Sequence, residues 1–330
     1  MAVRLIDIAK ESGCSISSVS AALKGNVSTA KVSSKKRKQI LDAAMRLGYR
    51  PSHAARTLKI GKTNVLGMVI REIHTPYYGE LVSSLMEEAE KHGYSILVYV
   101  TNWEDKKAVK AVDLLLGGRC DGLLLFEANM LNEHARQNEY IIKNKIPAIL
   151  ISNPKPKLPY VGREWDSGFI ETAEYLLSKG IRNTAFIGDS VTNLERPKLK
   201  SLKKVFSQYE LNLDFIECHN KPEAVYDFGQ NFKKFKNPPQ VILTENDTLG
   251  ASLLKGLFDA GVKVPDDVSV IGYNDTKFSK YSTPALTTIG FDKKAFVKTI
   301  IDLMVKMIDE KKLYSDVITF PTFLVKRDSA

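Results

Sequence analysis

The chain has 330 residues, of which 44% are hydrophobic, and its formal net charge at pH 7 is +10. This length exceeds what one hydrophobic core organises, so we expect two or three domains. We expect no membrane span, since no uncharged apolar run reaches about 18 residues, and no signal peptide, since the first ten residues lack its apolar segment. The cysteines are odd in number, far apart and in no metal-binding spacing, which predicts reduced thiols in a cytoplasmic protein.

The excess positive charge is confined to the beginning of the chain. Residues 1–62 contain 13 Lys and Arg against 3 Asp and Glu, a net charge of +10. The whole chain has 48 against 38, so residues 63–330 contain 35 of each sign and are neutral. A phosphate backbone attracts such a basic segment through the release of counterions. A solvated basic surface would not explain the even balance of the remainder, so we expect a nucleic-acid-binding N-terminal domain.

Residues 4–23 predict two short helices joined by a tight turn. Gly13 can end the first helix at positive φ without steric cost, and the hydroxyl of Ser15 can cap the second. Apolar side chains recur at helical spacing on both sides of the turn, at Leu5, Ile6, Ile8 and Ala9 and again at Val19, Ala22 and Leu23. This pattern is typical of a helix-turn-helix unit, whose second helix enters the major groove of DNA. The alternative is an ordinary helical hairpin within a core.

The second helix and the basic segment after it supply candidate DNA contacts. Four residues of that helix lie opposite its apolar face and would meet the bases. Ser33 can cap a third helix, in whose first turn four cations oppose the helix dipole. Phosphate contact explains that placement better than helix stability does. The candidates in this region are Ser15, Ile16, Ser17, Ser18, Ser20, Ala21, Lys35 and Arg37.

Residues 51–62 predict a hinge between the helical domain and the rest of the chain. Ser52 can cap a short helix that runs to Leu58, and Gly61 would end it. This helix is too short to be stable alone, so we expect it to form only against a partner chain and DNA. It adds Ser52, His53, Ala55 and Leu58 to the candidate DNA contacts.

The first 70 residues resemble the lac repressor/gal repressor (LacI/GalR) family of bacterial transcription regulators. The matching stretches are Asp7–Ala9, Gly13–Ser15, Ser18–Ser20, Leu47–Pro51 and Ala54–Leu58. The resemblance implies that Leu58 wedges into the minor groove at the operator centre, and that a homodimer binds a palindromic operator. This chain has Ala21 where the family usually has Arg, so relatives do not give its operator sequence.

From Asn64 onward, apolar runs alternate with amphipathic stretches, which predicts an α/β body with doubly wound parallel sheets. The runs are Val65–Ile70, Ile96–Val100, Gly122–Phe126, Pro147–Ile151, Thr184–Gly188, Phe215–His219, Val241–Thr244 and Val268–Tyr273. The proline-rich segment Asn153–Pro159 separates four runs from four and predicts the crossing between two lobes. The family resemblance, which extends over essentially the whole chain, likewise implies a two-lobed body similar to periplasmic sugar-binding proteins.

These patterns divide the chain into three parts. We expect an all-α helix-turn-helix DNA-binding domain over residues 1–50 and a hinge helix with a linker over 51–62. A two-lobed effector-binding and dimerisation domain would follow over 63–330. Its lobes would comprise approximately 63–157 with 286–316, and 158–285 with 317–330.

Ligands of α/β sheets bind beyond the carboxyl ends of the strands, and this rule selects the loops after five of the apolar runs. Their residues offer aromatic faces on which a polyol can stack and polar groups for its hydroxyls. The candidate effector contacts are Tyr77, Tyr78, Ser152, Arg196, Lys198, Asp247 and Asn274, and the family resemblance places effector contacts at the same positions. Two alternatives stay open, since either tyrosine could simply pack in the cleft and Asp247 could cap the following helix.

Three departures from the family bear on the ligand. Lys198 stands where many relatives have Arg, Asn274 where many have Asp, and Ser152-Asn153 where many have Asp-Arg. Lysine lacks the planar fork of arginine, and asparagine lacks the negative charge of aspartate. The resemblance implies a sugar, sugar acid or sugar phosphate as effector, and these changes predict a less acidic pocket that admits an anionic ligand.

Other functions are less compatible with the sequence. It has no G-x-G-x-x-G motif after a strand, no Walker lysine motif and no nucleophile paired with a base, so we expect no enzyme, no cofactor and no metal site. A transport binding protein would need an export signal. The expected function is a sequence-specific transcription regulator, in particular a repressor, whose operator affinity depends on an effector. Whether the effector weakens or strengthens DNA binding stays open.

Overall fold

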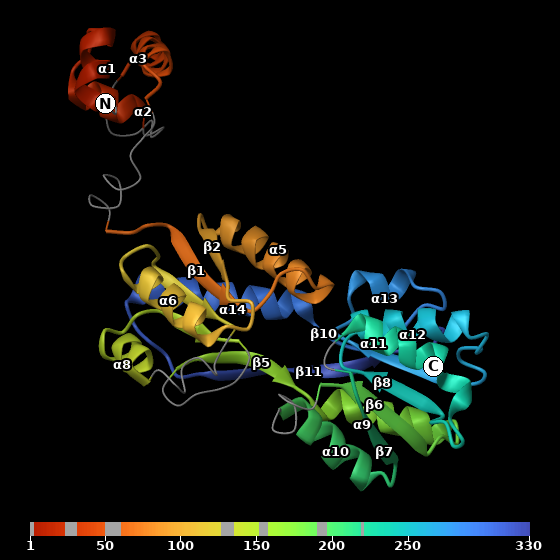
Figure 1. Cartoon of the computed structure of the whole chain (residues 1–330). Helices are drawn as coiled ribbons and strands as arrows, with labels where there is room; N and C mark the ends of the chain where they lie inside the picture. The colour runs from red at the N-terminus through yellow and green to blue at the C-terminus, as the bar shows by residue number, and fades with distance from the viewer. Residues whose placement is uncertain are drawn as a thin grey trace. The chain divides into compact units, whose positions relative to one another are not determined.

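The computed structural model describes residues 3–23, 32–49, 61–126, 135–151, 158–189, 197–218 and 221–330 (Figure 1). The chain divides into two compact units, Met1–Thr63 and Asn64–Ala330, which we call the head and the body. The predicted hinge helix, with Ser52, His53, Ala55 and Leu58, lies outside the described residues.

The head consists of three short helices around a small apolar core. These are α1 (Leu5–Ser12), α2 (Ile16–Leu23) and α3 (Ser34–Arg46). Gly13 ends α1 with a φ of 61°, and Ile8, Val19 and Ile40 are completely buried between the helices. The predicted helix-turn-helix is therefore confirmed, but Ile6, expected on the apolar face, has an exposed fraction of 41%.

The first lobe of the body is a parallel sheet with helices on both faces. Its strands are β1 (Val65–Ile70), β2 (Ser95–Val100), β3 (Gly122–Leu125), β4 (Ala148–Leu150) and β5 (Tyr160–Glu164). Its helices are α5 (Pro76–Lys91), α6 (Asp105–Leu116), α8 (Ala135–Lys143) and α14 (Lys293–Glu310). Strand residues alternate between two buried clusters: Leu66 and Met68 pack on the α5 and α14 side, whereas Val69 and Leu123 pack on the α6 side.

The second lobe repeats this arrangement. Its strands are β6 (Asn183–Gly188), β7 (Asn212–Glu217), β8 (Val241–Thr244), β9 (Ser269–Tyr273) and β10 (Thr287–Phe291). Its helices are α9 (Asp166–Ser178), α10 (Pro197–Gln208), α11 (Pro222–Gln230), α12 (Asp247–Asp259) and α13 (Lys277–Tyr281), with the 3-10 turn η1 (Phe232–Lys234). The predicted doubly wound α/β body is confirmed, and each of the eight apolar runs contributes a strand, with ends shifted by up to three residues.

One strand joins the two lobes into a continuous eleven-stranded sheet, of order β2-β1-β3-β4-β5-β11-β10-β9-β8-β6-β7. This strand is β11 (Val317–Val325). Its first half runs parallel to β5, with Val317 opposite Tyr160, and its second half runs antiparallel to β10, with Val325 opposite Thr288. The chain therefore passes between the lobes after β5, after β10 and within β11.

The lobe bounds differ from the expected ones. β5 follows the proline-rich segment but still pairs with β4 of the first lobe, so the first crossing comes after Glu164 rather than at Asn153–Pro159. β10 pairs with β9 of the second lobe, so the return comes after Phe291 rather than at residue 286. Proline breaks the local pattern, but the choice of lobe depends on which strands pair across long sequence distances.

The structure also bears on membrane association. Among the described residues, no helix is long and apolar enough to cross a membrane.

Close packing of α11 on α12 gives a testable prediction about glycine. A Cβ added at Gly256 of α12 would collide with the carbonyl oxygen of Tyr226 and lie 3.1 Å from Cα of Gly229. Gly256→Ala should therefore push the helices apart and destabilise the body by about 1–3 kcal/mol. The matched control is Gly79→Ala in α5, where the nearest atom would lie 3.4 Å away. Thermal unfolding should show a lower Tm for the first variant only, and equal Tm values would contradict this packing argument.

Candidate functional site

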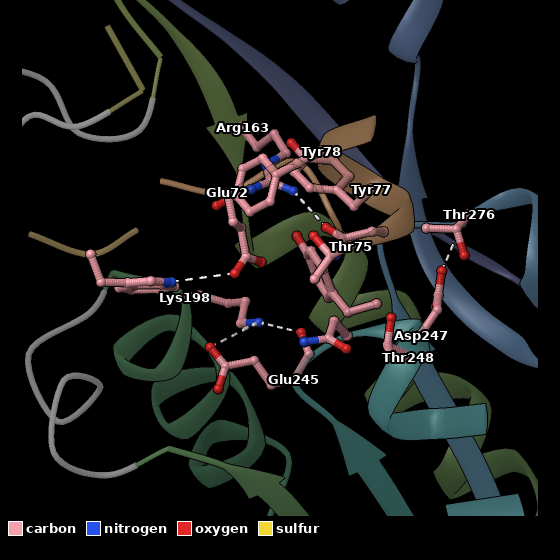
Figure 2. Close-up of a pocket in the computed structure, with 14 residues that line it drawn as sticks. Glu72, Thr75, Tyr77, Tyr78, Arg163, Lys198, Glu245, Asp247, Thr248 and Thr276 are labelled. Carbon is pink, nitrogen blue, oxygen red and sulfur yellow. Dashed lines mark hydrogen bonds and ion pairs between the residues drawn. The ribbon is translucent and has the colours of Figure 1, made fainter. Parts of the chain in front are cut away.

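A pocket of about 140 Å³ lies between the two lobes (Figure 2), which is below the range of about 300–1,000 Å³ that is usual for small-molecule sites. It lies at the carboxyl ends of β1, β8 and β9, where the strand-end rule places ligands. Its lining residues are Glu72, Thr75, Tyr77, Tyr78, Trp103, Arg163, Lys198, Glu245, Asn246, Asp247, Thr248, Tyr273, Asn274 and Thr276. Both lobes therefore contribute side chains to one site.

The first turn of α5 places two tyrosines at the pocket. Pro76 occupies the first helical position, where its missing N–H is not needed, and Tyr77 and Tyr78 follow directly. Their rings contact each other edge to face, with centroids 5.1 Å apart. Tyr78 also packs on Phe126 of the first lobe, with centroids 6.4 Å apart. The tyrosines thus line the pocket and pack in the cleft at the same time, so the two alternatives for them do not exclude each other.

Arg163 projects from β5 into a cluster of aromatic rings. Its Cζ lies 4.5 Å from the ring centroid of Trp165, 5.1 Å from Tyr77, 5.2 Å from Phe291 and 5.7 Å from Tyr273. Such distances allow the cation to interact with the negative faces of the rings. One guanidinium nitrogen donates a hydrogen bond of 3.0 Å to Oδ1 of Asn274. Because Arg163 and Asn274 belong to different lobes, this bond joins them across the pocket.

Asp247 is committed to bonds within the second lobe. Its carboxylate accepts hydrogen bonds from the backbone N–H of Thr276, at 2.6 Å, and from the hydroxyl of Thr288, at 2.5 Å. The predicted capping role belongs instead to Asn246, whose side chain accepts from the N–H of Leu249 at the start of α12. Asp247 is only 3% exposed, and burial raises its pKa to about 6, although the Thr276 N–H and the threonine hydroxyls oppose that rise.

The second cation of the pocket, Lys198, lies beside Glu245. Its Nζ donates a hydrogen bond of 2.7 Å to the carbonyl oxygen of Glu245 and lies 3.9 Å from the carboxylate. It also lies 4.6 Å from the ring centroid of Tyr273. The carboxylate of Glu245 accepts a further bond from the N–H of Asp189. Residues at the ends of β6 and β8 and in α10 are thereby held together.

Trp103 forms one rim of the pocket in a strained backbone segment. Asn102 and Trp103 have φ values of 51° and 66°, a left-handed conformation that costs L-residues about 1–2 kcal/mol each. The indole N–H donates to the carboxylate of Glu72 at 3.3 Å, and the ring stacks under Arg71, whose Cζ lies 4.2 Å from its centroid. These contacts fix an aromatic face at the entrance of the site.

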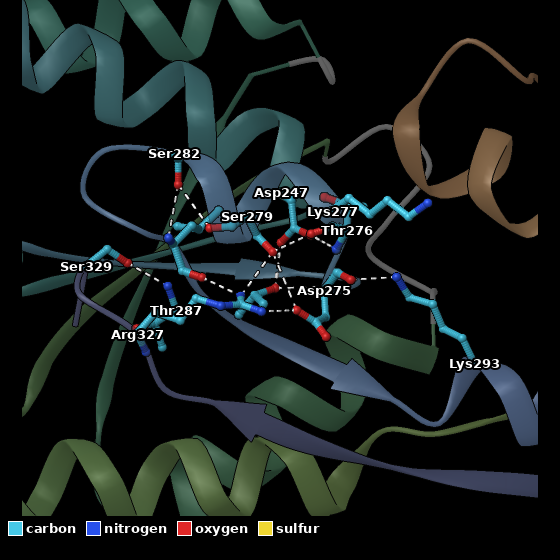
Figure 3. A network of polar contacts seen from close by, with 12 residues as sticks. Asp247, Asp275, Thr276, Lys277, Ser279, Ser282, Thr287, Lys293, Arg327 and Ser329 are labelled. Carbon is cyan, nitrogen blue, oxygen red and sulfur yellow. Dashed lines mark hydrogen bonds and ion pairs between the residues drawn. The ribbon is translucent and has the colours of Figure 1, made fainter.

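A polar network includes Asp247 and Thr276 of the pocket lining and extends to Asp275, Lys293 and Arg327 (Figure 3). A guanidinium nitrogen of Arg327 lies 2.5 Å from the carboxylate of Asp275, and Lys293 donates to the carbonyl oxygen of Asp275 at 2.5 Å. Lys293 also lies 3.2 Å from the carboxylate of Glu80 in α5. Glu80 in turn accepts from the backbone N–H of Lys277 at 2.8 Å. Glu80 therefore links α5 of the first lobe to α13 of the second.

The structure brings together five of the seven predicted effector contacts: Tyr77, Tyr78, Lys198, Asp247 and Asn274 all line the pocket. Ser152 and Arg196 lie outside the described residues. The lining of the pocket contains three carboxyl groups, of Glu72, Glu245 and Asp247, and two cations, Arg163 and Lys198. That a ligand touches these residues stays a prediction.

Nine lining residues were not among the predicted effector contacts: Glu72, Thr75, Trp103, Arg163, Glu245, Asn246, Thr248, Tyr273 and Thr276. Glu72 and Glu245 follow β1 and β8 directly, so the strand-end rule applied more closely could have found them. Arg163 lies inside the short, mixed strand β5, and Trp103 depends on a turn that shows no local signal. For these two, only the folded arrangement reveals the position.

The predicted DNA contacts of α2 and α3 lie on accessible parts of the head. Ser15, Ile16, Ser17 and Lys35 are exposed, and Ser18, Ser20, Ala21 and Arg37 are partly buried. The hydroxyl of Ser15 accepts from the N–H of Ser18, at 3.2 Å, at the start of α2, and it lies 2.8 Å from the hydroxyl of Ser17. The start of α2 thus carries a cluster of small polar side chains.

Comparison with known proteins gives matches to both units. A family model of bacterial regulatory proteins, lacI family, matches residues 4–52, and a model of a periplasmic binding protein-like domain matches residues 173–330. The HTH-type transcriptional regulator DegA of Bacillus subtilis is 30% identical over 296 residues, which are 88% of this chain and 87% of DegA.

Two solved structures have the same fold. A lac repressor dimer bound to operator and the anti-inducer ONPF has a TM-score of 0.83 at 21% identity, over 100% of this chain and 99% of that one. A LacI family transcriptional regulator from Lactobacillus casei with bound sucrose has a TM-score of 0.71 at 17% identity, over 81% of this chain and 99% of that one.

The raised pKa of Asp247 predicts how stability depends on pH. Its folded value of about 6 lies above the ordinary value of 3.8, so between these values the folded protein binds more protons than the unfolded chain. The contribution of Asp247 to stability therefore falls as the pH rises through this window, by up to about 3 kcal/mol. Asp247→Asn should gain stability relative to the parent protein between pH 4 and pH 7, as measured by thermal unfolding.

The control for this measurement is the exposed Asp316→Asn. The Tm of Asp316→Asn should differ little from that of the parent protein, and by a similar amount at pH 4 and at pH 7. If the Tm of Asp247→Asn and the Tm of the parent protein depended on pH in the same way, burial of Asp247 would not raise its pKa.

Proposed function

This chain belongs to the LacI family of bacterial regulatory proteins, and we propose that it is a transcription repressor whose operator affinity changes when a sugar or sugar derivative binds between its lobes. The observation that carries this proposal is the pocket itself, which two lobes line with aromatic and polar side chains in a chain that also has a basic helix-turn-helix head. Family membership makes the chain a DNA-binding transcription regulator. Repression and the class of ligand are the proposed parts.

The lining of the pocket suits a polyol. Tyr77, Tyr78 and Trp103 offer ring faces, and Arg163, Asn246 and Thr248 offer donors and acceptors. Among the described residues, the hydroxyls of Thr75 and Tyr273 are buried without a hydrogen-bond partner. Since buried hydroxyls are nearly always bonded, ligand hydroxyls that reached them would satisfy them. The sucrose-bound structure of the Lactobacillus casei regulator supports a ligand of this class.

Coupling to DNA would follow from the position of the pocket. A ligand that contacts both lobes favours whichever lobe arrangement it fits best. The lobes are held together by the Arg163–Asn274 bond, by the bond from the N–H of Lys277 to Glu80 and by the bond from Lys293 to Asp275, which a ligand could reinforce or weaken. The predicted hinge precedes β1 in the sequence, and we propose that its residues Ser52, His53, Ala55 and Leu58 contact DNA. Coupling free energies of this kind are typically about 1–3 kcal/mol.

We also propose that the active form is a homodimer. Exposed aromatic side chains lie on two helices of the second lobe: Phe278 and Tyr281 of α13 are 65% and 76% exposed, and Phe258 of α12 is 73% exposed. A groove between α11, α12 and α13 adjoins Phe278. Exposed apolar patches on soluble proteins commonly mark interfaces, and the lac repressor structure with the same fold is a dimer on its operator. A dimer would place two heads on a palindromic site.

Two further parts of the proposal concern chemistry and location. Relatives such as DegA are transcription regulators by name, so we infer that this chain binds its ligand without transforming it. Binding to bacterial DNA also requires that the protein work in the cytoplasm.

The head assignment predicts a change in salt dependence. Lys35→Gln combined with Arg37→Gln removes two cations from the first turn of α3, and each lost phosphate contact should reduce the slope of log K against log salt by about 0.9. We expect a slope smaller by about 2 for a mixed-sequence duplex, measured by fluorescence anisotropy from 50 to 200 mM salt. The matched control, Lys106→Gln with Lys236→Gln in the body, should leave the slope unchanged. Equal effects of the two double variants would contradict DNA binding through the head.

The dimer assignment predicts the effect of placing a charge at Phe278. Phe278→Asp should shift the protein from dimer to monomer at micromolar concentration in analytical ultracentrifugation, because an interface disfavours a buried, unpaired carboxylate. Operator affinity should fall with it, since two half-sites would no longer be bound together. Phe235→Asp, at an exposed phenylalanine directly after η1, is the control. A parent protein that is monomeric would contradict the dimer assignment. A Phe278→Asp variant that stays dimeric would show that the interface does not include Phe278.

A further inference from the structure

We propose that the ligand of this pocket carries an oxyanion, either a carboxylate or a phosphate on a polyol, and that Arg163 binds it. This inference rests on the ligand-binding role proposed above for the pocket. It goes further by naming the chemical class of the ligand and the residue that selects it.

Aromatic rings surround the guanidinium of Arg163, but few hydrogen-bond acceptors lie beside it. Its guanidinium has five N–H donors, and one of its nitrogens donates to the neutral amide oxygen of Asn274. Four rings surround it, from Trp165, Tyr77, Phe291 and Tyr273. Among the described residues, no carboxylate oxygen lies within 4.0 Å of its nitrogens. The remaining donors belong to a side chain that lines the pocket.

The carboxylates of the pocket are engaged elsewhere. Glu72 accepts from the indole of Trp103 and lies 3.5 Å from His74. Glu245 lies beside Lys198 and accepts from the N–H of Asp189.

The other two nearby carboxylates are also used. Asp247 accepts from Thr276 and Thr288. Glu164, next to Arg163 in the chain, accepts from the backbone N–H and the hydroxyl of Ser167 at the start of α9. Of the two cations in the lining, Lys198 has the carboxylate of Glu245 beside it, whereas Arg163 has no carboxylate within 4.0 Å among the described residues.

An oxyanion is the partner that this environment favours. A partly buried cation without a counter-charge is costly, because few water molecules can reach it. Ring faces offset part of that cost, but they leave the edge of the guanidinium, with its N–H donors, unoccupied. Carboxylate and phosphate groups match the planar fork of arginine with two parallel hydrogen bonds. A neutral sugar hydroxyl can accept one such bond and brings no charge.

The position of Arg163 also connects this contact to regulation. It comes from β5 of the first lobe, whereas Asn274, Trp165 and Tyr273 belong to the second lobe. An oxyanion that draws the guanidinium toward itself would compete with the Asn274 bond, and so would act on the junction of the lobes. A purely structural role for Arg163, as a link between the lobes, is the alternative that the experiment must separate.

The experiment uses the full-length protein and matched pairs of ligands. Glucose, galactose and fructose are compared with their uronic or aldonic acids and their phosphates, with inorganic phosphate as a probe of the anion alone. The two tryptophans of the chain give a direct fluorescence signal, since Trp103 lines the pocket and Trp165 packs on Arg163. Calorimetry then gives Kd, and release of operator-containing genomic DNA fragments reports function.

We expect at least one acid or phosphate to bind at least tenfold more tightly than its neutral parent. Arg163→Gln should remove that preference, whereas Arg163→Lys, which keeps the charge but not the fork, should retain part of it. Arg119→Gln, at an exposed arginine of the first lobe, is the matched control and should leave both affinities unchanged. Thermal unfolding of every variant establishes that the fold is intact.

The possible outcomes separate this inference from the function on which it rests. If neutral sugars bind and release DNA as well as their anionic counterparts do, the oxyanion assignment is wrong but the regulator proposal stands. If Arg163→Gln weakens neutral and anionic ligands equally, Arg163 is only a structural link and the assignment is wrong. If no compound of either charge binds, both proposals fail.

Discussion

The contact of Arg163 with residues of both lobes is the interaction on which the pocket depends. Its guanidinium, from β5, is enclosed by rings that include Tyr77 of the first lobe and Tyr273 of the second, and Asn274 accepts its hydrogen bond. Any rotation of one lobe against the other must change these distances. A single cation therefore couples the shape of the pocket to the arrangement of the whole body.

The carboxylates of the pocket bond within their own lobes and so leave the junction between the lobes to a few other groups. The carboxylates of Glu72, Glu245 and Asp247 each have polar partners that come from their own lobe, so they stabilise the walls of the pocket rather than the junction. Glu80 and Lys293 add further polar links between the lobes, through the N–H of Lys277 and the carbonyl oxygen of Asp275. A lobe thus behaves as a pre-organised unit, and the few groups between the lobes are the ones that a ligand can influence. This separation is what a two-state regulator requires.

Five of the fourteen residues that line the pocket could be predicted from sequence. Tyr77, Asp247 and Asn274 follow apolar strands, and the carboxyl ends of parallel strands meet at one edge of a sheet. Arg163 and Trp103 could not be found in this way. Arg163 belongs to a short strand with polar residues, which looks like a loop when its neighbours β4 and β11 are unknown. Trp103 depends on two left-handed residues that only the finished fold can hold in place.

The sequence by itself determined the features that depend on near neighbours. These are the +10 charge of residues 1–62, the helix-turn-helix around Gly13, and the alternation of buried strands and amphipathic helices. The tertiary structure decided where the chain crosses between lobes, because β5, β10 and β11 gain their places by pairing with strands that are distant in sequence. It also decided which charges remain without a counter-charge, since residues 72, 163 and 245 become neighbours only when the sheets have formed. Local patterns set the elements, whereas contacts between distant strands set the pocket.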